Sequence, residues 1–152
     1  MTERLELPEP DLASFAARFT GRVIRPDDAD YPAARSVWNG MIDRYPALIV
    51  RPTSADEVAA AIRLAREHDL PVAVRGGGHN VAGLGVCDTG VVIDLTDLAT
   101  VLVDPAARTI QAGGGCTWGA LDKAAAEHGL ATPGGLIYTT GVGGLTLGGG
   151  IG

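Results

Sequence analysis

The sequence predicts a mixed α/β (α+β) fold, and three observations support this prediction. Short apolar runs of strand length alternate with a stretch of helical periodicity, the second of these runs ends on three consecutive glycines, and further strands and a helix follow that loop. A strand, a helix and a strand in this order are typical of a sheet covered by helices. The 152 residues, 46% of them hydrophobic, suffice for one domain with its own core.

Residues 1–46 are expected to be an N-terminal lead-in outside the core. A helix is predicted from Pro10 to Phe19, with Asp11 at its start and Gly21 closing it. A segment rich in Pro and Asp follows at residues 25–32 and predicts irregular structure.

Regular elements are predicted from Ala47 onward. Residues 48–51 are a short apolar run that predicts a buried strand, and residues 72–74 predict the next one. Between them a helix should begin with Ser54 as its N-cap and Glu57 at the capping-box position. This helix is expected to end near His68 and to bury three apolar residues on one face: Val58, Ile62 and Ala65.

A second group of elements follows the glycine loop. Strands are predicted at residues 91–95, 101–104 and 109–112, and the Asp-Pro turn at residues 104–108 makes the last two a hairpin. A helix is predicted at residues 118–128, with Thr117 as its N-cap and Gly129 as its stop, and Leu121 and Ala125 facing inward. Residues 133–152 are dominated by glycine.

Charge and composition favour a small molecule as the partner. A net charge of -6 and a pI near 4.9 would repel nucleic acids and anionic membranes. The only lysine, Lys123, does not follow a glycine loop, so a Walker-type phosphate loop is excluded. Cys87 and Cys116 lack the spacing of a zinc site and are expected to be reduced thiols, and no metal site is predicted. Because the N-terminus has no signal peptide and no membrane span, a cytoplasmic location is expected.

Glycines gather in five clusters, at residues 76–78, 83–85, 113–115, 134–135 and 141–150. One such cluster alone is most often a tight turn, whereas five at strand ends suggest that several backbone segments converge on one large ligand. None fits the dinucleotide pattern G-x-G-x-x-G, because Val81 and Thr146 stand where the last glycine should be.

The junction Arg75-Gly-Gly-Gly-His-Asn is the strongest candidate for a site. Three glycines without Cβ atoms let backbone N–H groups converge on an anion, so the loop reads as a phosphate cradle with His79 at its rim. Arg75 could be a surface charge, a structural residue or a phosphate partner. His68 and His128 stand at helix ends, where an imidazole suits the last-turn carbonyls.

Four motifs carry a resemblance to a known family. They are Arg75-Gly-Gly-Gly-His-Asn-Val-Ala-Gly, Val92-Ile-Asp-Leu, Ala131-Thr-Pro-Gly-Gly and Gly141-Val-Gly-Gly-Leu-Thr-Leu-Gly-Gly-Gly. In order and spacing, residues 47–152 resemble the FAD-linked oxidases of the vanillyl-alcohol-oxidase or PCMH type, in the berberine-bridge-enzyme-like branch. The resemblance implies a PCMH-type FAD-binding domain of two α/β subdomains, the second incomplete at Gly152, in an N-terminal piece of a longer protein without its substrate domain.

The resemblance also implies which residues bind FAD. In the family the loop matching residues 75–79 wraps the pyrophosphate, and the histidine matching His79 is bonded covalently to the flavin 8α-methyl carbon. Some relatives add a second bond through a cysteine, but Ile137 stands at that position, so a single 8α-histidyl bond is expected. Others carry a histidine at the position of Leu145. The residues expected to contact FAD are Arg75, Gly76, Gly77, Gly78, His79, Asn80, Gly83, Pro133, Gly134, Thr139, Gly141, Val142, Gly143, Gly144, Leu145, Gly148 and Gly149.

The function that the resemblance implies is an FAD-dependent oxidoreductase. It would take a hydride from a C–H bond next to oxygen or nitrogen of a small-molecule substrate onto flavin N5, and would pass electrons to O₂ or another acceptor. The catalytic base is expected outside residues 1–152, so this piece alone should be inactive. Two alternatives stay open: a reductase that holds FAD without a covalent bond, and an FAD-binding fragment without redox chemistry. The oligomeric state is open as well.

Overall fold

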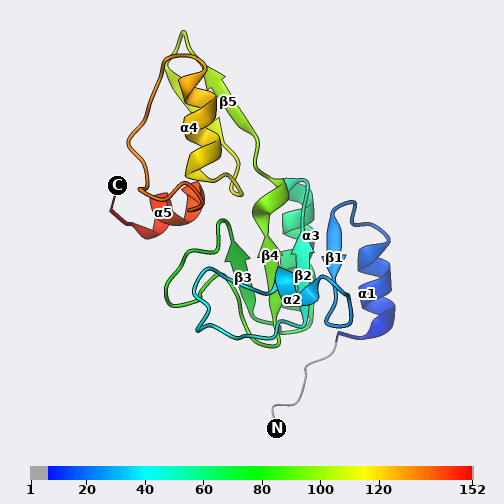
Figure 1. The fold of residues 1–152 in the computed structure, drawn as a ribbon. Helices are drawn as coiled ribbons and strands as arrows, with labels where there is room; N and C mark the ends of the chain where they lie inside the picture. Colours follow the sequence, from blue (N-terminus) through cyan, green and yellow to red (C-terminus); the bar gives the residue numbers. More distant parts are fainter. Residues whose placement is uncertain (1–6, 152) are drawn as a thin grey trace.

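The main sheet is built from short apolar runs, and its two central strands are buried on both faces. In the computed structural model, which describes residues 7–151, four strands pair in the order β1-β2-β4-β3 (Figure 1). Strands β2 (Leu48–Arg51), β3 (Val72–Arg75) and β4 (Val91–Asp94) are parallel, and β1 (Arg22–Ile24) runs antiparallel along β2. The predicted strands at residues 48–51, 72–74 and 91–95 are therefore confirmed, and β4 lies between the two strands that flank the first long helix.

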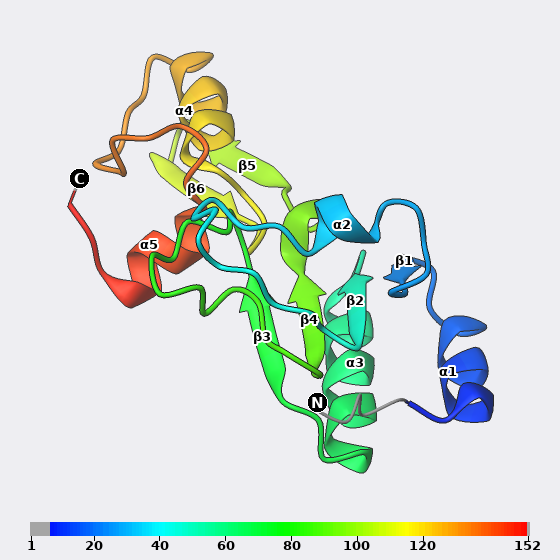
Figure 2. The same ribbon diagram turned by 60° about the horizontal axis from the view of Figure 1, so that its bottom comes forward.

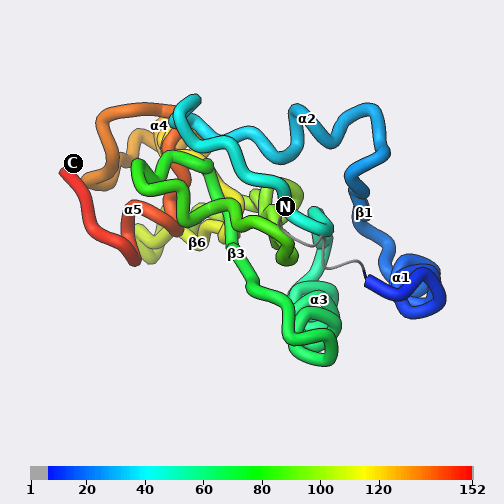
Figure 3. Tube along the Cα trace, turned by 90° about the horizontal axis from the view of Figure 1, so that it is seen from below, coloured from blue at the N-terminus to red at the C-terminus, as the bar shows by residue number. Residues whose placement is uncertain are grey.

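Helix α3 (Ala55–Glu67) connects β2 to β3 and packs on one face of the sheet together with α1 (Glu9–Ala16), whereas the short α2 (Tyr31–Ala34) lies on the other face (Figures 1 and 3). Alternate residues of each strand serve the two faces. Leu48 and Val50 pack under α1 and α3, and Ile49 packs with Tyr31 and Ala34. Both faces of β2 and β4 are thus covered, as expected for parallel strands, whereas Val72 and Val74 on one face of β3 are 42% and 54% exposed.

The N-terminal segment differs from its prediction. Helix α1 begins at Glu9 and ends at Ala16, and its N-cap is Pro8, so Asp11 lies inside the helix and caps nothing. Leu12, Phe15 and Phe19 belong to the core cluster under α3. The expectation that residues before 47 stay outside the core is therefore wrong, because the apolar positions of α1 cover the face of β2 that α3 leaves open.

Helix α3 confirms its predicted N-cap and corrects its predicted face. The Ser54 hydroxyl accepts a hydrogen bond from the Glu57 N–H at 3.3 Å. The Glu57 carboxylate, however, turns to Thr20, Gly21 and Thr53 and makes no capping box. The buried face consists of Glu57, Ala61, Leu64 and Ala65, while Ile62 is 46% exposed. The apolar periodicity did not identify this face correctly, because a charged residue, Glu57, lies on it.

The second unit contains a hairpin and a helix beside it (Figure 1). Strand β5 (Val101–Asp104) pairs antiparallel with β6 (Thr109–Ala112), after a short 3-10 helix at Leu95–Asp97. Helix α4 (Trp118–Ala126) has the predicted Thr117 cap, whose hydroxyl accepts from the Ala120 N–H, and Gly129 follows it with a φ of +65°. The hairpin and this helix are confirmed. Helix α5 (Val142–Gly148) lies among the glycines and was not predicted.

Candidate functional site: a cleft between two glycine segments

Two glycine segments far apart in sequence touch each other beyond the end of β3. A Cβ on Gly77 would overlap the backbone N of Gly141 and would lie 2.8 Å from the carbonyl oxygen of Thr139. A Cβ on Gly141 would in turn meet the backbone of Gly76 and Gly77. The second segment is fixed from behind, because Val142 donates its N–H to the Cys116 carbonyl at 2.8 Å. Only glycine lets the two backbones approach this closely.

A cleft of about 520 Å³ opens beside this contact and is lined by residues of the loop after β3 and of helix α5. Figure 2 shows these two segments on the same side of the molecule. Eleven of the predicted cofactor residues line it: Arg75, Gly76, Gly77, Gly78, His79, Asn80, Gly141, Gly144, Leu145, Gly148 and Gly149. Six lining residues were not predicted, and most of them add apolar surface: Val74, Val81, Ala82, Leu84, Gly85 and Thr140. Most residues that line the cleft were thus predicted from the sequence, although they come from two segments about sixty residues apart.

The other predicted cofactor residues lie behind the lining or beside it. Gly83 has a φ of +73° and faces Ile42, Gly134 packs on the ring of Trp118, and Gly143 faces Gly114. Val142 is tied to Cys116, and Thr139 reaches the rim through its hydroxyl. Pro133 is exposed in the loop before Gly134. Contact of these residues with a cofactor stays a prediction.

His79 stands at the rim of the cleft with its ring held on two sides. Its Nε2 lies 2.9 Å from the hydroxyl oxygen of Thr139. The indole of Trp38 stacks on the imidazole, with 5.4 Å between the ring centres and 21° between the planes. The residue is half-buried and lines the cleft, so the ring is accessible to a ligand there.

Arg75 has a structural role. Its side chain is 6% exposed and lies in an ion pair with Asp94 at 2.9 Å, and it also donates to the carbonyls of Ala34 and Ser36. Burial raises the pKa of Asp94, but hydrogen bonds and charge from Arg75, with Thr96 and Arg51, outweigh it and lower the pKa below its usual value. The guanidinium is therefore engaged with the protein, and any contact of Arg75 with a phosphate would use its backbone.

The segment between α2 and β2 forms the back of the glycine loop, and sequence reasoning missed it. Trp38 donates its N–H to the Gly78 carbonyl at 3.2 Å, and Asn39 donates its side-chain amide to the Val81 carbonyl at 2.9 Å. Ile42 packs against Gly83 and Arg44 donates to the Val86 carbonyl. The two stretches run side by side (Figures 2 and 3). A tryptophan next to a turn-forming Asn-Gly pair was the only signal in the sequence.

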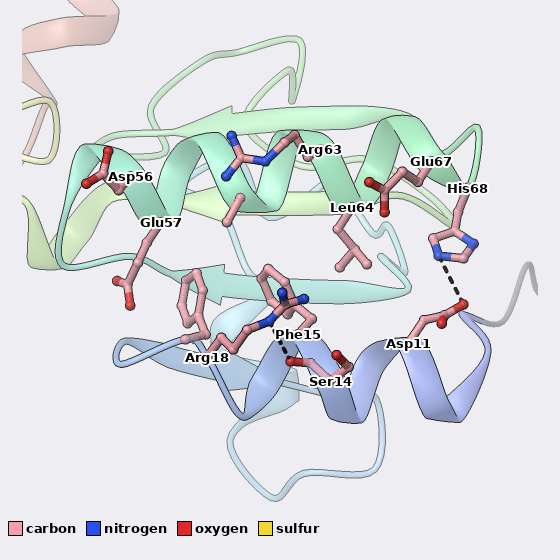
Figure 4. Close-up of a pocket in the computed structure, with 12 residues that line it drawn as sticks. Asp11, Ser14, Phe15, Arg18, Asp56, Glu57, Arg63, Leu64, Glu67 and His68 are labelled. Carbon is pink, nitrogen blue, oxygen red and sulfur yellow. Dashed lines mark hydrogen bonds and ion pairs between the residues drawn. The ribbon is translucent and has the colours of Figure 1, made fainter.

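A larger hollow of about 650 Å³ lies elsewhere, between α1 and α3 (Figure 4). Two contacts join residues of its lining: His68 Nε2 lies 3.5 Å from Asp11, and Arg18 donates to the Ser14 carbonyl. No glycine loop reaches it. The cleft at the glycine loops is therefore the better candidate site although it is smaller.

The cleft fits a ligand that lies close to the backbone. A Cβ built on Gly144 or Gly148 would meet no protein atom within 4 Å, so packing within the protein does not require glycine at these positions, whereas Gly149 has a φ of +83° that favours glycine. Gly144 and Gly148 both line the cleft. A bound group pressed against the backbone would explain them. The side chains lining the cleft include no Lys, and their only Arg is paired with Asp94, so an anion would be bound by backbone N–H groups.

Fold and cleft together define a nucleotide-cofactor-binding domain, and comparison with known proteins identifies its family. Residues 46–152 match the profile of a family described as "FAD binding domain", and this chain belongs to that family. The FAD that the family implies fits the cleft, with its glycine-lined wall and its loop of three consecutive glycines.

Relatives and solved structures agree with this assignment. The chain is 40% identical over 132 residues to (R)-6-hydroxynicotine oxidase of Paenarthrobacter nicotinovorans, a match that covers 87% of this chain and 29% of the relative. The crystal structure of 6-hydroxy-D-nicotine oxidase from Arthrobacter nicotinovorans superposes with a TM-score of 0.88 and 37% identity, covering 97% of this chain and 31% of that one. For BBE-like 1 of Physcomitrella patens the TM-score is 0.84 at 30% identity, with 92% and 31% covered.

These findings confirm the mixed α/β fold of PCMH type and the resemblance to FAD-linked oxidases. They also show that the chain spans about 30% of the length of the curated relatives it matches. Both cysteines are free, as predicted, with Cys116 buried and Cys87 half-buried. Within residues 7–151, no helix has the length and apolar character needed to cross a membrane, and no cluster of three or more His, Cys, Asp or Glu side chains could bind a metal ion.

Proposed function

We propose that the full-length protein is an FAD-dependent oxidoreductase and that residues 47–152 are the N-terminal part of its FAD-binding domain, with residues 1–46 leading into it. The observation that carries the proposal is the cleft itself: glycines that no internal packing requires line it, in a chain that belongs to the FAD binding domain family. When bound, FAD supplies the redox chemistry by taking a hydride from a C–H bond next to oxygen or nitrogen at flavin N5.

The role of this part of the chain is to bind and orient the cofactor. Backbone N–H groups of Gly76, Gly77 and Gly78 are oriented by the turn after β3, and we assign them to the pyrophosphate because no free cationic side chain competes for it. The backbone of Gly141, Gly144 and Gly148 forms the opposite wall. The cofactor would thus lie between the two glycine segments.

We assign His79 as the covalent attachment point of FAD, through the flavin 8α-methyl carbon. The bond joins a ring nitrogen to that carbon, and one hydrogen leaves the imidazole and one the methyl group. Two electrons and these two hydrogens reduce O₂ to H₂O₂, which balances the step. The position of the half-buried ring at the rim of the cleft supports this assignment. A single bond is expected, because Ile137 occupies the position of the second attachment residue and Cys116 is buried.

The substrate is proposed to be a small molecule, and the electron acceptor O₂ or another compound. One relative is named for 6-hydroxynicotine, and a structural neighbour, the grass pollen allergen Phl p 4, has glucose dehydrogenase activity. Amines and sugars are therefore the first classes to screen. A cytoplasmic location fits the sequence and is part of the same proposal.

The test is acid denaturation of the full-length protein followed by mass analysis of its peptides. Covalent attachment predicts a yellow precipitate and an FAD-sized mass increment on the peptide that contains His79, and His79→Ala should lose both. Flavin released intact by acid would instead indicate a non-covalent FAD enzyme, the alternative reductase type. A purified protein that binds no flavin would contradict the proposed function.

A further inference from the structure

Two side chains from outside the glycine loop hold the imidazole of His79. Trp38 stacks on its face, with 5.4 Å between ring centres, and Thr139 lies 2.9 Å from its Nε2 at the ring edge. Among residues 7–151, no side chain or backbone group forms a hydrogen bond to its Nδ1. One ring nitrogen is therefore engaged and the other is free.

Both holding residues are themselves fixed. The backbone of Trp38 is hydrogen-bonded to the Gly78 carbonyl, and its neighbour Asn39 is bonded to the Val81 carbonyl, so the indole is tied to the same loop that carries His79. Thr139 stands between Tyr138 and Thr140, whose carbonyls accept hydrogen bonds from the first residues of α4 at 2.9 and 3.0 Å. The imidazole thus contacts two segments, those of Trp38 and Thr139, that are each held in place by hydrogen bonds.

An exposed histidine without such contacts would sample several rotamers and both neutral tautomers. Stacking limits rotation of the ring. A threonine hydroxyl can donate or accept, so the contact at Nε2 accommodates either tautomer, and when the hydroxyl accepts, the hydrogen lies on Nε2. That tautomer leaves a lone pair in the ring plane at Nδ1, which is the form needed for attack on an electrophilic carbon.

We propose that Trp38 and Thr139 are positioning residues for the formation of the His79–FAD bond, an inference that rests on the proposed covalent attachment. Thr139 accepts the hydrogen of Nε2, and Trp38 fixes the ring plane. The new bond forms at Nδ1, the Nε2 proton leaves along the Thr139 hydroxyl to solvent, and the second hydrogen comes from the flavin methyl group. O₂ takes up the two electrons and both hydrogens as H₂O₂.

The position of Trp38 extends the site into the N-terminal segment of the chain. The residue lies before the region matched by the family profile, which begins at residue 46. Its indole is 62% exposed, so the core does not depend on it for packing. A tryptophan that the core does not need, stacked on the reactive histidine, is explained by a role at the site.

The test measures the rate at which FAD becomes covalently attached to the protein. Full-length apoprotein is mixed with FAD in air, total bound flavin is read from native absorbance, and attached flavin is read from fluorescence of the denatured band. We expect Thr139→Val and Trp38→Leu to bind FAD in wild-type amount but to attach it roughly ten- to a hundredfold more slowly, the range expected when reacting groups lose orientation. Thr139→Ser should restore the wild-type rate, because it keeps the hydroxyl, and Trp38→Phe should restore part of it.

Two control variants change an exposed threonine and an exposed apolar residue that make no contact with the imidazole. Thr109→Val alters an exposed threonine of the hairpin, and Met41→Leu alters an exposed apolar residue of the segment that carries Trp38. Both should attach FAD at the wild-type rate.

The possible results distinguish failure of the positioning role from failure of the proposed covalent bond. Wild-type attachment rates in Thr139→Val and Trp38→Leu would overturn the positioning role and leave the covalent bond in place. Loss of FAD binding in both variants would also overturn it, since the residues would then act in binding or folding. A wild-type protein that binds FAD but never attaches it would overturn both the inference and the covalent bond, while leaving an FAD-dependent oxidoreductase.

Discussion

The glycines that line the cleft differ in the space around their Cα atoms, and replacing each with alanine tests this difference. Gly77 accommodates another backbone, whereas Gly144 faces open space within α5. An added methyl group therefore has opposite effects on stability at the two positions, although both line the same cleft.

We expect Gly77→Ala to destabilise the full-length protein by roughly 1–3 kcal/mol, because overpacking forces the two glycine segments apart. Gly144→Ala should stabilise the free protein by up to about 1 kcal/mol through helix propensity, yet weaken FAD binding. Chemical denaturation and flavin titration measure the two quantities. If Gly144→Ala bound FAD as tightly as the wild type, the cofactor would not lie against this wall.

The buried ion pair behind the loop is the second residue-scale feature with a clear expectation. Asp94 accepts from Arg75, Arg51 and Thr96, and its carboxylate is almost completely buried. Asp94→Asn would leave the buried Arg75 without its counter-charge, which typically costs about 3–5 kcal/mol. Asp30→Asn, which breaks an exposed pair with Arg22, should cost less than about 1 kcal/mol. Equal losses in urea denaturation of the two variants would contradict the structural role of Arg75.

At the scale of elements, one carboxylate joins α3 to the turn between α1 and β1. Glu57 accepts hydrogen bonds from Thr20, Gly21 and Thr53. Burial alone raises the pKa of Glu57, but these hydrogen bonds outweigh it and lower the pKa to about 2. The contact therefore requires the ionised form.

A lowered folded-state pKa gives the sign of the pH dependence. The stabilisation by Glu57 is fully present above the unfolded pKa near 4.5 and is lost as the pH falls toward about 2. We expect Glu57→Gln to lose roughly 1–3 kcal/mol at pH 7 and to show a shallower decline of stability between pH 4.5 and pH 2. Unfolding curves measured across this window test the prediction, and parallel curves for wild type and variant would refute it.

The elements predictable from sequence were those with a local signal. The apolar run at residues 48–51, the Ser54 and Thr117 caps and the Asp-Pro turn of the hairpin each specify local structure through neighbouring residues, and each was confirmed. Helix α5 was missed because three of its seven residues are glycine, which disfavours a helix by about 1 kcal/mol each. Tertiary contacts hold it instead, among them the bond from Val142 to Cys116.

The candidate site was predictable where glycine marked it and not where distant residues meet. The loop at residues 76–79 and the segment from Gly141 were found from their composition, and they do face one cleft. The stacking of Trp38 on His79 joins residues 41 positions apart, and no sequence periodicity indicates it. The role of Arg75 stayed open between a surface charge, a structural residue and a phosphate partner, because its counter-charge, Asp94, comes from another strand.

At the scale of the whole molecule, the N-terminal segment is part of the structure that holds the site. Leu12, Phe15 and Phe19 complete the core under α3, β1 pairs with β2, and residues 38–44 brace the glycine loop. The region that the family profile matches begins only at residue 46. That region alone would expose an apolar sheet face and leave β2 as an unpaired edge strand.

Deleting residues 1–45 from the full-length protein should therefore abolish cooperative thermal unfolding of the FAD-binding domain and flavin binding with it. Phe15→Ala is the matched control: it should cost roughly 3–5 kcal/mol by opening a cavity, yet keep a single cooperative transition, because the sheet pairing and the brace at the glycine loop remain. Calorimetry and dye binding to exposed apolar surface distinguish the two cases. A deletion variant that unfolds cooperatively near the parent temperature would mean that β2, α3, β3 and β4 form an independent core. Residues 38–44 would then serve only His79, and FAD attachment, rather than stability, would be the property lost.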